Sequence, residues 1–160
     1  MPRSPILIAS GLIVIVNLGC SPAERSESGE IESAGSVDAF ALRVGDCYDD
    51  QMFSSDGFSE VSDVPGVPCS VAHDNEVYAT FDLSGSEFPG DDEVVELADE
   101  GCLDRFEGAI GATYEESVLL ITTLYPTRAS WTQAEDREVI CGAYHMELEK
   151  LTGSVLNSGM

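Results

Sequence analysis

Four of the five cysteines of this 160-residue chain lie between residues 47 and 141, and they restrict how that part can fold. They are Cys47, Cys69, Cys102 and Cys141, and no two are close enough in sequence to form a CxxC redox or zinc motif. Four cysteines allow three disulfide pairings. We favour sequential pairing, Cys47–Cys69 and Cys102–Cys141, in which each bond stabilises the domain by roughly 3–4 kcal/mol in the loop-closure model.

The fifth cysteine, Cys20, follows an N-terminal apolar run. Residues 6–18 read ILIASGLIVIVNL, which is too short to span ~30 Å of hydrocarbon but is typical of the apolar core of a signal peptide. The following NLGC resembles the lipobox of bacterial lipoproteins, although Asn17-Leu18 departs from the usual pattern. The resemblance implies a signal peptide over residues 1–19 and a lipid such as palmitate on Cys20. It also implies an extracytoplasmic location with a lipid anchor in the cell membrane.

Residues 20–38 are rich in Ser, Glu, Gly and Ala and have few bulky apolar side chains. Such a composition buries too little surface to offset chain entropy, so we expect a disordered tether with a reach of roughly 25 Å. The predicted domain then covers residues 39–155, and residues 156–160 form a short tail. Lipid, tether and domain would follow one another in that order.

The chain is strongly acidic, with 30 acidic residues against 7 basic ones and a formal net charge of -23. A field of this sign repels phosphate backbones, so we exclude nucleic acid as a partner. It also repels anionic lipid headgroups, so membrane attachment has to come from an anchor. Basic proteins and divalent cations remain possible partners.

The spacing of apolar residues predicts an α+β fold, in which one principal helix packs on a face of a small antiparallel or mixed sheet in the order β-β-β-α-β-β. The helix begins at Asp91 or Asp92, which can cap it, and ends between Gly108 and Gly111. Its apolar stripe includes Cys102, which should face the sheet. Three strands are predicted before the helix: a short strand ending at Gly45-Asp46, an edge or extended segment over 61–70 with Pro65 and Pro68, and a strong strand over 76–83. Two follow the helix: a second strong strand over 117–125 and a long strand from 138.

Three further features follow from the same pattern. In the strand over 76–83, alternation places Val77, Ala79, Phe81 and Leu83 on one face. The connection between the first two strands is rich in turn residues, and Asp56-Gly57 is its best candidate for a tight turn. Residues 130–137 form a short helix or a turn before the last strand.

Several fragments of the domain, in their order and spacing, resemble the septum-formation domain of actinobacterial extracytoplasmic proteins. They are LRVGDCY, VPCSVAHDNEVYATFDL, FPG, GC within the helix, PTRASWTQAEDREVIC and LTGSV, and together they cover about residues 42–155. The resemblance implies an exported domain with cysteines at the four positions named above and a connection to the envelope or to cell division. It brings no catalytic residues with it.

The candidate site residues are His73 and Asp74, with Glu76 nearby. They could form an acid–base set, but neighbouring residues entering a strand point to opposite sides, which prevents convergence. We therefore interpret His73 and Asp74 as a turn before the strongest strand, exposed and suited to recognition. Cys69 near His73 could be a thiol nucleophile, but a disulfide leaves it without a thiolate.

Metal sites find little support in the sequence. A zinc site made of Cys69, His73 and His145 would need a long-range coincidence. The acidic cluster near Asp91 lacks the spacing of an EF-hand, and helix capping explains it. We expect no metal and no cofactor, and we find no motif of a known catalytic class.

These observations predict a non-enzymatic, lipid-anchored protein of the cell envelope that acts as an interaction or structural module linked to septum or envelope processes. Its partner would be an unidentified envelope or division protein. One alternative is an envelope hydrolase that uses His73, Asp74 and Glu76. Another is an acidic lipoprotein that binds cations or a basic partner.

Overall fold

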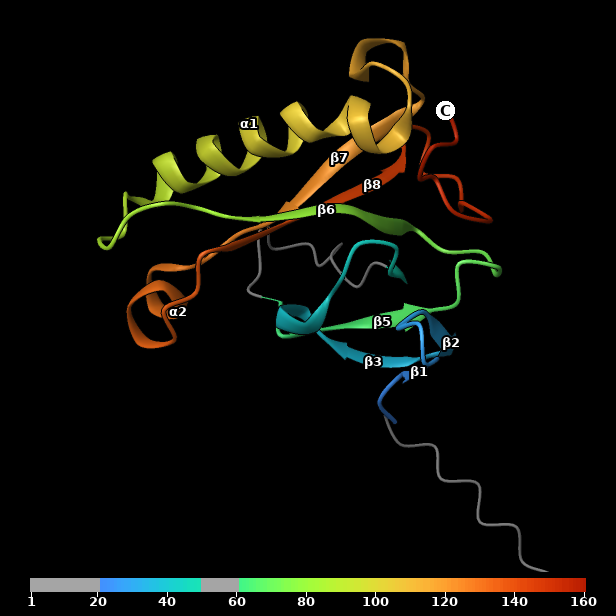
Figure 1. The fold of residues 1–160 in the computed structure, drawn as a ribbon, viewed down its shortest axis with the longest axis horizontal. Helices are drawn as coiled ribbons and strands as arrows, with labels where there is room; N and C mark the ends of the chain where they lie inside the picture. Colours follow the sequence, from blue (N-terminus) through green and yellow to red (C-terminus); the bar gives the residue numbers. More distant parts are fainter. Residues whose placement is uncertain (1–20, 50–60) are drawn as a thin grey trace, which may run out of the picture.

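The computed structural model describes residues 21–49 and 61–160, shown in colour in Figure 1. The predicted signal peptide, Cys20 and the predicted turn at Asp56-Gly57 lie outside these described residues.

The fold is α+β, as the sequence predicts, and is built on a six-stranded sheet in the order β3-β5-β4-β6-β8-β7. Each neighbouring pair in this sheet is antiparallel. A separate two-stranded sheet pairs β1 with β2. The elements are β1 (Glu24–Arg25), β2 (Ile31–Ser33), β3 (Gly35–Asp38), the 3-10 helix η1 (Ala39–Ala41), β4 (Cys47–Tyr48), β5 (Asp63–Val67), β6 (Asn75–Asp82), α1 (Asp91–Ile110), η2 (Tyr114–Glu116), β7 (Leu119–Leu124), α2 (Arg128–Gln133) and β8 (Glu138–His145).

Helix α1 is the principal helix, and it lies across β6, β7 and β8 (Figure 1). Every fourth residue of one stripe is buried, namely Val94, Ala98, Cys102, Phe106 and Ile110. The helix ends at Gly111, whose φ of 88° suits glycine. The predicted side-chain cap is wrong, because the cap residue is Gly90 and makes no such bond. Asp91 and Asp92 instead lie in the first turn, where the helix dipole favours negative charge.

Apolar side chains form two clusters, one on each side of the central strands. The larger cluster packs α1 against β6, β7 and β8 and includes Trp131 of α2. The second contains Val77 of β6, Ile140 of β8 and residues of β2, β3 and β5. Figure 1 shows the reason: β3 and β5 lie below β6 and β8, on the side opposite α1. The central strands are therefore covered on both faces.

The predicted alternation of β6 fails at one point. A register shift between Val77 and Ala79 marks a β-bulge in the pairing of β6 with β8. Because the bulge changes the parity of the strand, Val77 joins the second cluster, while Ala79, Phe81 and Leu83 pack in the cluster under α1. Tyr78 also packs in the cluster under α1, where its hydroxyl donates to the carbonyl of Cys102 at 2.8 Å.

Two of the N-terminal strands differ from their predictions. The first predicted strand ends at Gly45-Asp46, whereas β4 begins after that turn. The prolines predict an edge strand or an extended segment, whereas β5 lies between β3 and β4. The Pro65 carbonyl accepts from the Asp49 amide at 2.9 Å, so the Pro65 nitrogen faces the same side. This side lies beyond Tyr48, where β4 has ended, so the missing N–H of Pro65 removes no bond of the β4–β5 ladder.

The expectation of a disordered tether is corrected over residues 21–38, which carry β1, β2 and β3. Ile31 and Val37 are buried in the second cluster at 7% and 6% exposure. Arg25 makes a bidentate ion pair with the buried Asp46, at 2.6 and 2.7 Å. The average composition of the segment did not reveal these contacts. A few apolar residues and one correctly placed cation are enough to dock a short segment on an existing sheet.

None of the helices in the described parts of the chain is both long enough and apolar enough to cross a membrane.

Candidate functional site

Two disulfides connect the elements of the domain. Cys47–Cys69 joins β4 to the segment after β5, and Cys102–Cys141 joins α1 to β8. This is the sequential pairing. Cys47, Cys102 and Cys141 are fully buried, whereas Cys69 is partly exposed.

His73 does not lie on an exposed corner, which corrects the prediction. Its side chain is 0% exposed. The cause is the C-terminal segment, because Leu151 forms an antiparallel bridge with His73 through two backbone hydrogen bonds of 3.1 and 2.8 Å. Leu151 and Val155 are themselves buried and close this side of the domain. Sequence alternation could not reveal a pairing with a residue 78 positions further along the chain.

Asp74 points the other way and is partly exposed. Its carboxylate lies 2.8 Å from the Nζ of Lys150, which also contacts Asp49 at 2.8 Å. Hydrogen bonds to Asp49 and then Asp74 raise the pKa of Lys150. The expectation that neighbouring residues diverge at this point is confirmed, and Asp74 is an ion-pair residue next to the buried cluster.

Glu76 is also fully buried, although it is a carboxylate. It accepts a hydrogen bond from the Ser154 hydroxyl at 2.6 Å and another from the Val155 backbone amide at 2.5 Å. Both donors belong to the C-terminal segment that covers His73. Glu76 therefore holds that segment against the start of β6.

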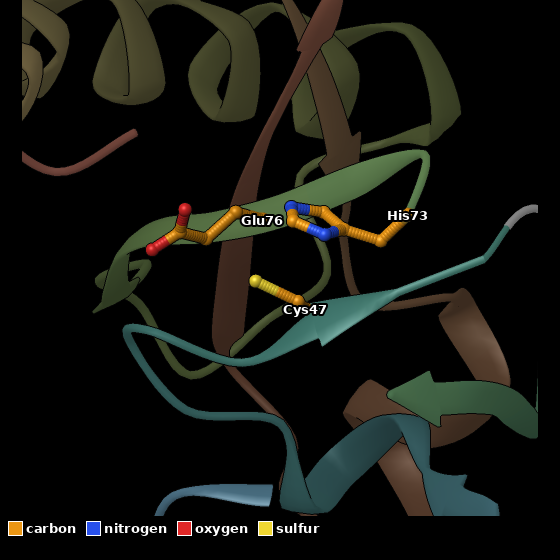
Figure 2. A group of neighbouring side chains, drawn as sticks. All are labelled: Cys47, His73 and Glu76. Carbon is orange, nitrogen blue, oxygen red and sulfur yellow. The ribbon is translucent and has the colours of Figure 1, made fainter. Parts of the chain in front are cut away.

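The Sγ of Cys47, a ring nitrogen of His73 and a carboxylate oxygen of Glu76 lie within 4.8 Å of one another. Figure 2 shows the three side chains as they leave β4, the segment before β6, and β6 itself. We refer to them as the buried cluster. Register explains the convergence, because Cys47 pairs with Glu76 in the ladder between β4 and β6.

The predicted set of His73, Asp74 and Glu76 is therefore only partly assembled. His73 and Glu76 come together, Asp74 does not join them, and the third member is Cys47. One local signal could have pointed to this, since Glu76 directly precedes the apolar and aromatic residues 77–79 at the start of β6, which are buried. With the disulfide formed, the buried cluster holds no thiolate, and its burial leaves no room for a polymer substrate.

A second group, His145, Glu147 and Glu149, follows the end of β8 and has ligand atoms within 4.8 Å of one another. Two of its members, His145 and Glu149, line a cavity of about 270 Å³ together with residues 150–155 and Met160. The Nδ1 of His145 accepts from the Glu147 amide at 3.2 Å. Both glutamates are exposed, so solvation accounts for their charges.

The comparison with protein families gives one match, to a family described as septum formation, over residues 44–158. The match covers most of the chain and includes both disulfides and the buried cluster. No curated protein and no solved structure matches the chain.

Proposed function

The chain belongs to the septum formation family, and on this premise we propose that it is a non-enzymatic module of the cell envelope that acts by binding an envelope or division protein. The family match over residues 44–158 is the observation that carries the proposal. Two disulfides support an exported location, because such bonds persist outside the reducing cytosol.

A non-enzymatic role is supported by the state of the candidate residues. His73 and Glu76 are fully buried, Cys47 is in a disulfide, and Asp74 is paired with Lys150. Acid–base chemistry needs groups that reach a substrate within hydrogen-bond distance. His73 and Glu76 instead hold the C-terminal segment, through Leu151 and through Ser154 and Val155 respectively.

We further propose that Cys20 carries the lipid that anchors the protein outside the membrane. The support is the apolar run before it and the NLGC sequence at its end. In labelled cells, palmitate should enter the wild-type protein and fail to enter a Cys20→Ala variant. Equal labelling of the two proteins would contradict the anchor.

The role in septation is tested separately by deleting the gene and complementing the strain. We expect altered spacing or timing of septa in the deletion strain, restored by the wild-type chain. The Asp74→Asn variant, which removes a carboxylate of the hydrolase alternative, should restore septa as well as the wild type does. Normal septa in the deletion strain would contradict a division role, and failure of Asp74→Asn at normal protein level would favour the hydrolase.

A second candidate function, binding of a basic partner, is favoured by the outer face of α1. This face exposes Asp91, Asp92, Glu93, Glu96, Asp99, Glu100, Asp104 and Glu107. Such a field attracts cationic proteins, and the attraction weakens as salt rises. The exposed Leu97 and Leu103, at 36% and 45%, add apolar contact area on the same helix.

Oligolysine is a suitable probe for this candidate. We expect Glu93→Gln, Glu96→Gln and Glu100→Gln together to weaken binding several-fold at low salt. The matched control replaces the exposed Glu24, Glu27 and Glu30 by Gln, which removes the same charge from the N-terminal segment. If both triple variants lose the same affinity, the attraction is due to net charge and α1 is not the binding face.

A further inference from the structure

We propose that the buried cluster becomes a zinc site when the Cys47–Cys69 disulfide is opened, with Cys47, His73 and Glu76 as its ligands. This inference does not rest on the proposed function. Its starting point is the distance limit of 4.8 Å among the three ligand atoms. Atoms this close to one another need to move inward by less than about 1 Å to reach zinc bond lengths of about 2.0–2.3 Å.

The hydrogen bond made by the His73 ring selects the tautomer in which Nε2 can bind a metal. Its Nδ1 lies 2.8 Å from the carbonyl oxygen of Val71. A carbonyl can only accept, so Nδ1 carries the proton, and the neutral ring has a lone pair on Nε2. Nε2 is buried and has no hydrogen-bond partner among the described residues. A histidine that binds a metal usually donates its other ring N–H to a carbonyl or carboxylate in this way.

Glu76 supplies an oxygen ligand that is already oriented. Its two oxygens accept from Ser154 and from the Val155 amide, and these bonds fix the carboxylate. An ionised carboxylate has about four acceptor positions, so lone pairs remain for a cation. A neutral imidazole, one carboxylate and one thiolate around Zn²⁺ carry no net charge, which suits a cluster whose members are 0% exposed.

Opening the disulfide is the step that creates the sulfur ligand. A dithiol reductant attacks the partly exposed Cys69 sulfur, forms a mixed disulfide and releases the Cys47 thiolate. The second thiol of the reductant then displaces the Cys69 thiolate, so that the reductant becomes a disulfide and the protein gains two thiols. Zinc binding keeps Cys47 as the thiolate and releases its proton to solvent.

Two variants, each lacking one cysteine of the Cys47–Cys69 disulfide, test the site without any reductant. Both are made in the full chain with Cys20→Ala, so that no other free thiol is present while Cys102–Cys141 stays intact. Cys69→Ser removes the disulfide and leaves the Cys47 thiol with His73 and Glu76. Cys47→Ser removes the same disulfide but also removes the proposed ligand, and is therefore the matched control. The probe is Co²⁺, followed by Zn²⁺ in competition.

We expect Cys69→Ser to bind one Co²⁺ with the visible absorption of tetrahedral cobalt and a near-ultraviolet thiolate-to-cobalt band. Zn²⁺ should abolish both signals and, at a hundredfold excess over its dissociation constant, raise Tm by roughly 5–10 °C. Cys47→Ser and the disulfide-bonded wild type should show neither effect. Adding His73→Asn to Cys69→Ser should abolish binding, because the amide can keep the bond to Val71 but has no atom at the place of Nε2.

Three results would overturn the proposal. The first is a folded Cys69→Ser variant without the thiolate-to-cobalt band. The second is equal Co²⁺ absorption in Cys69→Ser and Cys47→Ser, which would locate the metal elsewhere, for example at His145. If Cys69→Ser does not fold without metal, Zn²⁺ should restore its near-ultraviolet circular dichroism and should not restore that of Cys47→Ser. Failure of that restoration is the third.

Discussion

At the scale of single residues, Glu76 ties the C-terminal segment to β6. It is a buried carboxylate whose two hydrogen-bond donors, Ser154 and the Val155 amide, both belong to the segment that covers His73. We expect Glu76→Gln to lower the free energy of unfolding by about 1.5–3 kcal/mol, because it removes charge-assisted bonds and leaves a donor poorly matched. Urea denaturation of the oxidised protein measures this loss.

The matched control is Ser154→Ala, which removes one donor and keeps the carboxylate and the Val155 bond. Its expected loss is smaller, about 0.5–1.5 kcal/mol. Wild-type stability in Glu76→Gln would show that the segment is held by its apolar residues alone.

Glu138 is a residue at which ionisation opposes folding. Burial is the main cause that raises the pKa of Glu138, and the negative charges of Asp82 and Asp136 raise it further. Asp82 is its direct partner across the ladder between β6 and β8. The folded state therefore holds the Glu138 proton more tightly than the unfolded state does. Its contribution to the free energy of unfolding is fully present below the pKa of the unfolded state, and it is lost as pH rises through the raised pKa of the folded state.

The Glu138→Gln variant should therefore be more stable than wild type at neutral pH, by about 0.2–1 kcal/mol. The difference should shrink as pH falls towards about 4, where the wild-type carboxyl is protonated. Urea denaturation across this range tests both statements. Glu115→Gln removes an equal charge from an exposed site away from the sheet, and a matching gain in that variant would assign the effect to net charge.

At the scale of elements, the two disulfides should differ in how readily they are reduced. Both sulfurs of Cys102–Cys141 are 0% exposed between α1 and β8, whereas Cys69 is partly exposed. Thiol attack needs access to sulfur, so a mild reductant should open Cys47–Cys69 first and leave Cys102–Cys141 until the domain unfolds. Timed alkylation followed by peptide mass mapping gives the order. Simultaneous loss of both bonds in folded protein would contradict this prediction.

The elements that the sequence predicts correctly are those whose pattern is set by local burial. Helix α1 has its buried residues at every fourth position, and the core of β8 alternates between the two clusters. The elements that it misplaces depend on partners far along the chain. The position of β5 inside the sheet requires β3, which comes from a segment with the composition of a linker.

The difference between local patterns and long-range contacts also explains which parts of the candidate site the sequence could predict. The motif around His73 contains two of the three cluster residues, so the sequence could single it out. Burial of His73 depends on Leu151, and the approach of Cys47 depends on its register with Glu76. Neither contact leaves a local pattern. The site was therefore predicted by residue type and corrected by geometry, from an exposed corner to a buried cluster.

At the scale of the whole molecule, repulsion among carboxylates should set the response to salt. The net charge is -23, and the ion pairs among the described residues join only Arg25, Arg128 and Lys150 to acidic partners. Screening of long-range repulsion should outweigh the weakening of these pairs, so Tm should rise by several degrees between ~0.02 and ~0.5 M NaCl. Calorimetry across this series of NaCl concentrations tests the prediction. A fall in Tm with NaCl would mean that the ion pairs dominate.

The folded N-terminal segment changes what an anchored protein of this kind could reach. Ser21 already accepts a hydrogen bond from the Ser36 amide at 2.9 Å, and the Ala23 amide donates to the Ser36 carbonyl at 2.9 Å. A lipid on Cys20 would then be joined to the folded domain by a single peptide link, which spans about 3.8 Å between Cα atoms. The domain would search for its partner by lateral diffusion at the membrane surface, and a partner fixed deep in the cell wall would lie beyond its range.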